Sequence, residues 1–165
     1  MSQQKEKHHK GKIVEQFSRQ AIPFTQVPGH LDSIQILIEM VGVTGKDNVL
    51  DVACGPGLVA CEFARYAKQV KGVDITPAMI EQAEARQRQL GLKNLNWVLD
   101  DVAPLPFVDN SFSLVITRYS FHHFLTPQNS LYEMIRVSSR CKSAGGGRGD
   151  RFGQIQSLRS TGTYA

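Results

Sequence analysis

An apolar segment that runs directly into a glycine-bearing turn constrains the fold more than any other part of this chain. The segment reads Asn48-Val49-Leu50-Asp51-Val52-Ala53-Cys54-Gly55-Pro56-Gly57. Its first half has the composition of a buried strand, and Asp51 stands near the carboxyl end, where a half-buried carboxylate needs a partner. Gly55 and Gly57 allow a tight turn and a close approach of the backbone to a ligand, because they have no Cβ. The segment predicts a small-molecule pocket at the mouth of an α/β sheet.

Helix-like and strand-like segments alternate along most of the chain. Strands are predicted over residues 48–53, 70–74, 95–99 and 112–117, and helices over 5–20, 31–41, directly after the glycine turn, 77–90 and 127–137. Strands that alternate with helices imply right-handed parallel crossovers. We therefore expect an α/β fold with a doubly wound, mainly parallel, Rossmann-like sheet and a ligand site at its carboxyl edge.

Local signals predict several helix ends and buried faces. Gly42 and Gly91 are expected to end helices, and Thr76-Pro77 to begin one, as an N-cap and a first-turn proline. The stripes expected to face the core in the two central helices are Val59, Phe63, Tyr66 and Ala67, and then Ile80, Ala83, Gln87 and Leu90.

Length and cysteine usage limit the class of protein. A chain of 165 residues with 41% hydrophobic content suits one compact domain. No stretch approaches the ~20 apolar residues of a membrane span, and the polar start does not resemble a signal peptide, so a cytoplasmic location is expected. Cys54, Cys61 and Cys141 are odd in number and widely spaced. They predict ordinary thiols, without a metal site or disulfide framework.

The net charge of +4 does not predict a nucleic-acid surface once it is divided along the chain. Through Ser139, 14 Lys and Arg balance 14 Asp and Glu, and the excess comes from five basic residues in the tail, offset in part by Asp150. A nucleic-acid site should instead carry its basic residues on structured elements, among aromatic side chains. We expect no nucleic-acid partner.

Four sequence points fall at the same edge of the predicted sheet. They are the glycine turn, Asp74 after the second strand, Asp100-Asp101 after the third, and residues 118–124 after the fourth. A carboxylate past the second strand suits the two hydroxyl groups of a ribose, and one past the third can accept from an exocyclic amine. Met79 and Val102 could hold the faces of an adenine ring. Together these points describe a site for an adenosine-like ligand.

The motifs resemble those of the class I S-adenosylmethionine-dependent methyltransferases, over about residues 13–137. The order and spacing are most similar to the branch with ubiquinone- and menaquinone-type C-methyltransferases. Ala53 departs from the pattern, which usually has glycine there, and Asp100 stands where that branch often has glycine. The resemblance rests on Val49 to Gly57, Gly72-Val73-Asp74-Ile75-Thr76, Asp101-Val102-Ala103-Pro104-Leu105-Pro106-Phe107, Asp109 to Val115, and His122-His123.

The resemblance implies S-adenosylmethionine as the methyl donor, S-adenosylhomocysteine as the product, a small-molecule acceptor and no metal. It assigns Asp51 to the loop and the amino group, and the turn with Ala53, Cys54, Gly55 and Gly57 to the methionine part. Asp74 would hold the ribose and Asp101 the adenine amine, with Ile75, Met79 and Val102 on the faces of the ring. A helix that begins near Gly57 would favour the carboxylate of the cofactor.

Several roles remain open at this stage. His122 and His123 are candidates for catalysis or for packing, and Arg118 either lines the cofactor or lies on the surface. Asp100 could replace Asp101, and Phe17 with Phe24 could cover the reactive methyl group or simply pack. A nicotinamide-dependent oxidoreductase is the less favoured function, because Ala53 and Leu58 break its G-x-G-x-x-G pattern. A domain that binds the cofactor without turnover is the other alternative.

The last part of the chain departs from the pattern. We divide the chain into an N-terminal helix and loop that could form a lid (1–29), an incomplete cofactor-binding domain (30–139) and an irregular Gly/Ser/Arg-rich tail (140–165). No strand-like run follows Val137, so the sheet is expected to be truncated after the fourth strand. Reading the codons of residues 148–155 one nucleotide later permits Val-Ala-Ile-Asp-Leu-Val-Lys-Ser. We therefore hypothesise a frameshift near residues 138–147, which would leave the activity of the chain uncertain.

Overall fold

The computed structural model describes residues 3–20 and 30–139. Its four strands are β1 (Asn48–Val52), β2 (Gln69–Asp74), β3 (Leu95–Leu99) and β4 (Leu114–Ile116). Its helices are α1 (Gln3–Gln20), α2 (His30–Val41), α3 (Leu58–Phe63), α4 (Pro77–Leu90) and α5 (Pro127–Val137), and the segment before α5 contains the 3₁₀ turn η2 (Phe121–His123). The strands and helices follow one another in the predicted order.

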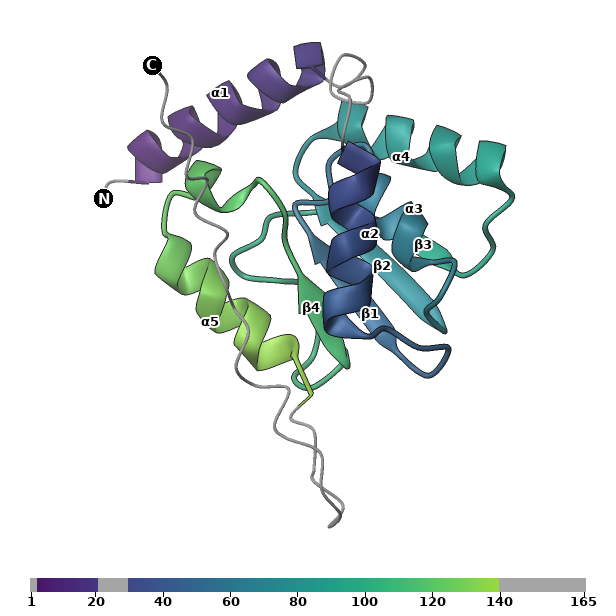
Figure 1. The fold of residues 1–165 in the computed structure, drawn as a ribbon. Helices are drawn as coiled ribbons and strands as arrows, with labels where there is room; N and C mark the ends of the chain where they lie inside the picture. Colours follow the sequence, from purple (N-terminus) through teal and green to yellow (C-terminus); the bar gives the residue numbers. More distant parts are fainter. Residues whose placement is uncertain (1–2, 21–29, 140–165) are drawn as a thin grey trace, which may run out of the picture.

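The four strands form one parallel sheet in the order β3-β2-β1-β4 (Figure 1). β1 is central, and the register pairs Asp51 with Gly72 on one side and with Ile116 on the other. All four strands are parallel. Helices join β1 to β2 and β2 to β3, and the non-helical residues 100–113 join β3 to β4; this is the geometry of a Rossmann-like sheet. The predicted α/β class is confirmed.

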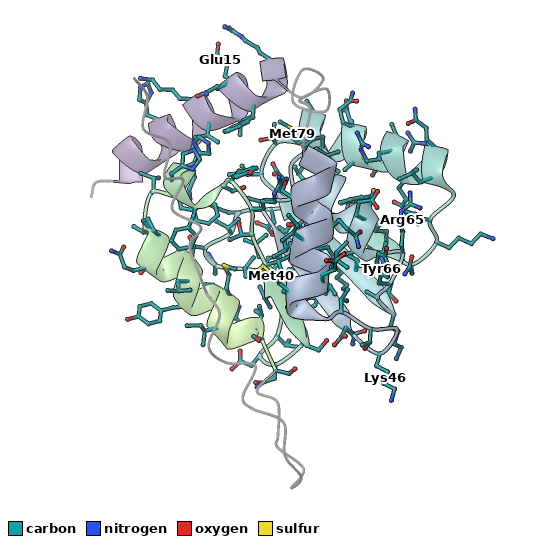
Figure 2. The ribbon with its side chains drawn as sticks, viewed as in Figure 1. Glu15, Met40, Lys46, Arg65, Tyr66 and Met79 are labelled. Atoms are coloured by element: carbon teal, nitrogen blue, oxygen red, sulfur yellow. The ribbon has the colours of Figure 1, made fainter. Side chains whose placement is uncertain are left out.

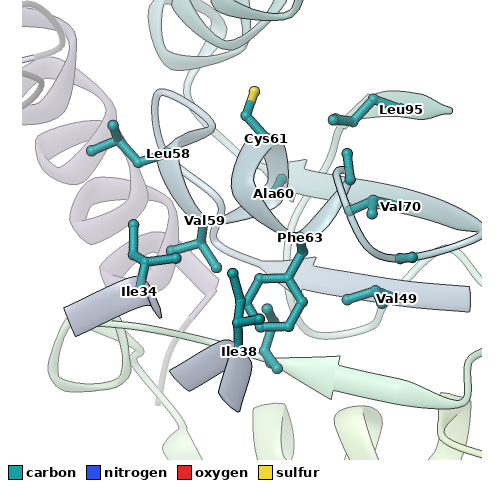
Figure 3. Close-up of a cluster of buried hydrophobic side chains, with 13 residues drawn as sticks. Ile34, Ile38, Val49, Leu58, Val59, Ala60, Cys61, Phe63, Val70 and Leu95 are labelled. Atoms are coloured by element: carbon teal, nitrogen blue, oxygen red, sulfur yellow. The ribbon is translucent and has the colours of Figure 1, made fainter. Parts of the chain in front are cut away.

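Helices cover both faces of the sheet, because neighbouring residues of a strand point to opposite sides and β1 and β2 carry apolar residues on both sides. On one face, Val49, Val70 and Leu95 pack against α2 and α3. Figure 3 shows Ile34 and Ile38 of α2 directed at Val59 and Phe63 of α3, above the strands. On the other face, Leu50, Val52 and Val73 pack with Phe112 and with Val137 at the end of α5. Asp51 lies between two apolar neighbours and points to the α3 side.

Some predicted boundaries and faces are wrong. α3 ends at Phe63, so the helical spacing does not continue to Tyr66, which is 43% exposed. Leu90 is 40% exposed, whereas Gln87 donates to the carbonyl groups of Leu92 and Leu95 and holds the inner position. Thr76 occupies the N-cap position of α4 without a side-chain capping bond. The helix ends at Gly42 and Gly91 are confirmed by their positive φ angles of 58° and 65°.

The fourth strand is shorter than predicted, and the chain pairs again beside it. Phe112 lies outside β4, in a parallel bridge with Ser138. The backbone amide of Phe112 donates to Val137, and that of Ser139 donates to the carbonyl of Phe112. The chain that leaves α5 therefore starts alongside the outer edge of β4. Cys141 and the proposed frameshift lie outside the described residues.

Within those residues, none of the helices has both the length and the apolar composition that crossing a bilayer requires. Cys54 and Cys61 are buried free thiols. Burial raises the pKa of Cys61 to about 12 and that of Cys54 well above its usual value. Neither thiol is therefore a nucleophile near neutral pH.

Candidate functional site

A pocket of about 420 Å³ lies at the carboxyl ends of the strands. Its walls come from the turn after β1, the loops after β2 and β3, the segment after β4, and one side of α1. Figure 1 shows α1 lying across this end of the molecule, near the start of α4. In Figure 2, Met79 at the pocket and Lys46 just before β1 lie at opposite ends of the fold. The pocket has the volume expected for a small ligand.

All predicted site residues except Gly57 line this pocket. The fourth strand contributes Arg118, His122 and His123 through the segment that follows it. The other lining residues from the prediction are Asp51, Ala53, Cys54, Gly55, Asp74, Ile75, Met79, Asp101 and Val102. The parallel topology brings them together, because the carboxyl ends of parallel strands meet at one edge.

Gly57 does not line the pocket, and its lack of a side chain has a packing reason. A Cβ at this position would lie 2.6 Å from the Trp97 ring and 2.9 Å from the Cβ of Ala83. Its φ of 76° also favours glycine. The absence of a side chain at Gly57 therefore lets the turn pack closely on β3 and α4. Gly55, by contrast, lines the pocket, and a Cβ there would reach only the Met79 sulfur at 4.0 Å.

The turn after β1 is held in a left-handed conformation. Ala53 has a φ of 56° and Gly55 a φ of 52°. The amide of Cys54 donates to the carbonyl of Val73, and the hydroxyl of Ser120 donates to the carbonyl of Ala53. These bonds join the turn to β2 and to the segment after β4. Ala53 accepts a conformation that costs an alanine roughly 1 kcal/mol.

Asp51 is a buried carboxyl group with an unused acceptor. The residue is 1% exposed, and its Oδ2 has no hydrogen-bond partner in the described structure. Burial is the main cause that raises the pKa of Asp51 to about 8, and the like charge of Asp74 adds to it. The backbone amide of Ala60 and the Arg118 guanidinium act in the opposite direction. A positively charged ligand group at Oδ2 would compensate the burial of this carboxylate.

Asp74 ties the glycine turn to the end of β2. Its Oδ2 accepts from the amide of Gly55 at 2.8 Å, and its Oδ1 accepts from the amide of Thr76 at 2.9 Å. Burial raises the pKa of Asp74, whereas these backbone amides lower it. A carboxylate has about four acceptor positions, so Asp74 keeps capacity for ligand hydroxyl groups.

Asp101 forms an ion pair that the sequence did not suggest. Its Oδ2 lies 2.6 Å from Nζ of Lys10 in α1, and its Oδ1 accepts from the amide of Val102 at 2.6 Å. The neighbouring Asp100 is exposed, and its carboxylate accepts from the amide of Asp101. Asp101 is the member of this pair that lines the pocket.

The segment after β4 supplies a cation and several rings. The Arg118 guanidinium donates to the hydroxyl of Ser33 in α2 and lies 4.2 Å from the centre of the Tyr119 ring. Tyr119 has a φ of 58°, a strained conformation for an aromatic residue. His122 and His123 have ring centres 3.8 Å apart, and Phe17 of α1 meets His123 edge-on at 4.8 Å.

The sequence reasoning missed most of the contribution of α1. Lys10, Ile13 and Gln16 line the pocket with Phe17, and of these only Phe17 was considered. Weak amphipathicity predicted the helix itself. No local pattern indicates that α1 folds over the carboxyl edge, because that contact joins segments far apart in the chain. Ser120 was missed for the same reason.

Comparisons with known proteins agree with this geometry. A family model described as a methyltransferase domain matches residues 49–145. The methyltransferase YcgJ of Bacillus subtilis is 30% identical over 106 residues, which make up 64% of this chain and 42% of that protein. Its crystal structure matches with a TM-score of 0.65 at 31% identity, over 67% of this chain and 47% of the other.

Two further relatives differ in the acceptor that their names state. The demethylmenaquinone methyltransferase of Porphyromonas gingivalis is 32% identical over 131 residues, covering 69% of this chain and 54% of the relative. An RNA methyltransferase of Lactiplantibacillus plantarum is 39% identical over 66 residues, covering 40% of this chain and 14% of the relative. The chain thus spans about half the length of the first two relatives.

The family match reaches residue 145, so it gives no support to a break in the pattern directly after Val137. It covers more than half of the chain and includes β2, β3, β4 and all of β1 except its first residue. The fold, the position of the pocket and this match lead to one conclusion: the chain belongs to the methyltransferase domain family, the class I S-adenosylmethionine-dependent methyltransferases.

Proposed function

We propose that this protein binds S-adenosylmethionine in the carboxyl-edge pocket and transfers its methyl group to a small-molecule acceptor. The observation that carries the proposal is the unpartnered Oδ2 of Asp51, buried in the pocket wall. The ammonium group of the cofactor would supply the missing partner. An unpaired carboxylate at this depth is costly, so a cationic ligand is the physical reason for keeping it.

Opposite charges suit the amino-acid end of the cofactor. Asp51 and Arg118 both line the pocket, and the charge of Arg118 acts on the carboxyl group of Asp51. Asp51 would bind the ammonium group and Arg118 the carboxylate, which together form a zwitterion. An arginine side chain can bind a carboxylate with two parallel hydrogen bonds.

The adenosine end would lie along the loops after β2 and β3. The free acceptor positions of Asp74 suit ribose hydroxyl groups, and the Asp101 carboxylate suits the amine of the base. Met79 is buried in the first turn of α4, and Val102 is buried after β3. Both line the pocket with Ile75 and could pack against the faces of an adenine ring.

The bound cofactor would supply a methyl group on a positively charged sulfur. The acceptor attacks the methyl carbon, the carbon–sulfur bond breaks, and its electron pair stays on the sulfur of S-adenosylhomocysteine. The protein contributes alignment of the two reactants and a pocket with little water, effects that can reach ~7 kcal/mol. His122 and His123 line the pocket and are our candidates for accepting the proton that an acceptor loses.

An apolar and aromatic wall supports a small-molecule acceptor. Ile13 and Phe17 of α1 line the pocket together with Phe124 and Leu125 of the segment after β4. The P. gingivalis relative is named for a quinone-type acceptor, demethylmenaquinone, and the described part of the chain carries no excess of positive charge. We therefore favour a flat, apolar acceptor over RNA. The absence of a nucleic-acid partner and the cytoplasmic location stay predictions.

Calorimetric titration with S-adenosylmethionine, S-adenosylhomocysteine and NAD tests the cofactor. We expect binding of the first two and none of NAD. Asp74→Ala and the milder Asp74→Asn should weaken binding, whereas Glu84→Ala, an exposed acid on α4 outside the pocket, should not. Circular dichroism shows whether each variant is folded. A folded wild-type protein that binds neither sulfur nucleoside would contradict the proposal.

Transfer of a labelled methyl group tests the acceptor and the turnover. Incubation with a demethylated naphthoquinol should label the quinol, and incubation with bulk RNA should leave the RNA unlabelled. Label in RNA alone would replace the small-molecule assignment. Cofactor binding without label in either acceptor would favour the alternative of a binding domain without turnover.

A further inference from the structure

The ion pair between Lys10 and Asp101 stands at the point where the proposed cofactor needs an acceptor. Lys10 is the basic residue that α1 contributes to the pocket lining. Its Nζ lies 2.6 Å from Asp101 Oδ2, and the two side chains are 33% and 26% exposed. The ammonium group of Lys10 and the amine of an adenine ring are both hydrogen-bond donors. They would therefore compete for the same carboxylate.

The other oxygen of Asp101 relieves this competition only in part, because it already has one donor. Oδ1 already accepts from the amide of Val102 at 2.6 Å, within the loop that follows β3. An adenine amine that enters the pocket must therefore displace Lys10 from Oδ2 or share one of the two oxygens with its present donor. Lys10 can be displaced from this partly exposed ion pair, because such pairs stabilise a protein by only about 0.2–1 kcal/mol.

The same ion pair fastens α1 to the site. α1 also contacts α4, and its Phe17 meets His123 edge-on at 4.8 Å on the acceptor side of the pocket. The exposed face of α1 carries Lys12, Glu15 and Arg19. A helix with so few apolar residues depends on tertiary contacts for its position. Loss of the ion pair at Asp101 would therefore also affect the position of α1, and with it the part of the pocket wall that contains Phe17.

We propose that Lys10 is a gate at the adenine end of the pocket, whose ammonium group occupies Asp101 until the exocyclic amine of the cofactor takes its place. This inference rests on the proposed function, and it adds a specificity-determining residue to it. For a base with a carbonyl oxygen in place of the exocyclic amine, Lys10 would favour binding instead of opposing it. Lys10 could donate to that oxygen while Asp101 could not.

Titration of purified full-length variants with S-adenosylhomocysteine tests the gate. Lys10→Ala should bind this product about two- to five-fold more tightly than the wild type, because the competing ion pair is gone. Lys12→Ala is the matched control, since it removes the same charge from the exposed side of the same helix. Its affinity should equal that of the wild type. Asp101→Asn should weaken binding.

Titration with S-inosylhomocysteine, in which a carbonyl oxygen replaces the amine, provides the sharper readout. Here Lys10→Ala should weaken binding relative to Lys12→Ala, so the effect of one substitution reverses sign between two ligands. A residue that merely supports the loop would change both affinities in the same direction. Thermal melts monitored by circular dichroism check that the variants share one fold.

The outcomes separate this inference from the proposed function. If the wild type does not bind S-adenosylhomocysteine, the proposed function fails and the gate fails with it. If the wild type binds and Asp101→Asn weakens binding, while Lys10→Ala binds no more tightly than Lys12→Ala, only the gate is overturned. Weaker binding of both ligands by Lys10→Ala would overturn it as well, and would make Lys10 a support for Asp101.

Discussion

Ala53 is a residue whose backbone conformation fits its side chain poorly. Its φ of 56° lies in the left-handed region, at a turn joined by hydrogen bonds to β2 and to Ser120. We expect Ala53→Gly to raise the free energy of unfolding by about 1 kcal/mol, because glycine adopts this conformation without strain. Chemical denaturation measures the change.

Ala85→Gly is the matched control for this prediction. Ala85 lies inside α4, where glycine should lower the free energy of unfolding by about 1 kcal/mol. The same substitution is therefore expected to act with opposite signs at two positions. Equal destabilisation of both variants would show that the turn does not strain Ala53.

Asp51 should make the free energy of unfolding depend on pH. The ionised form of its side chain, which would bind a cationic ligand, is the form that destabilises the fold. Its pKa rises from 3.8 to about 8 on folding, mainly through burial. Between these values the unfolded chain releases a proton that the folded protein keeps. The contribution of Asp51 to the free energy of unfolding therefore falls as the pH rises from about 4 to about 8.

Asp51→Asn removes that contribution, and Asn can still accept from the amide of Ala60. We expect the variant to be more stable than the wild type at pH 8 by at least about 1 kcal/mol, and little different at pH 4. It should also lose affinity for S-adenosylhomocysteine. Urea denaturation at both pH values tests this, and an identical pH dependence of the two proteins would refute it.

At the scale of elements, one helix organises the long segment between β3 and β4. Arg136 of α5 donates to the carbonyl groups of Leu105 and Phe107 and pairs with Asp109 at 2.8 Å. Glu133, one turn earlier, accepts from the amide of Leu105 at 2.7 Å and pairs with Arg136. This network holds the chain just beyond the pocket residue Val102.

Glu133→Gln should weaken that connection. The Arg136 side chain, through its hydrogen bonds, is the main cause that lowers the pKa of Glu133 below 4.5, so the stabilisation is present at neutral pH and is lost as the pH falls through the lowered pKa. We expect a loss of about 1 kcal/mol at pH 7 that shrinks in acid. Glu84→Gln, in an exposed ion pair with Arg88, should change stability little. Denaturation curves at several pH values compare them.

The elements that the sequence predicts well are those with local signals. The bounds of α4 follow from Thr76-Pro77 and Gly91, and the helix predicted over residues 127–137 is α5. The end of α3 and the length of β4 had no such signal. α3 stops at Phe63 inside an apolar stripe, and Phe112 leaves β4 because it pairs with Ser138, 26 residues later. Contacts with distant segments decide those boundaries.

At the scale of the whole molecule, topology explains which site residues could be predicted. Asp51, Asp74 and Asp101 each follow or end a strand, so the parallel order alone brings them to one edge. Lys10 and Ser120 reach that edge through the packing of α1 and of the segment after β4, which no spacing in the sequence encodes. The sequence singles out Gly57 as a site that needs glycine, but the reason for this need is the Trp97 ring, which packs against the site.

That packing gives the protein an optical probe of its own. Trp97 is the single tryptophan of the chain; its ring lies where side chains on Gly57 and Gly72 would be, and its Nε1 donates to Gln87. The indole thus reports on the back of the turn whose front faces the pocket. We expect S-adenosylhomocysteine to change the fluorescence of Trp97 in a saturable way. The Trp97→Phe variant should be silent, so ligand binding could be followed without any label.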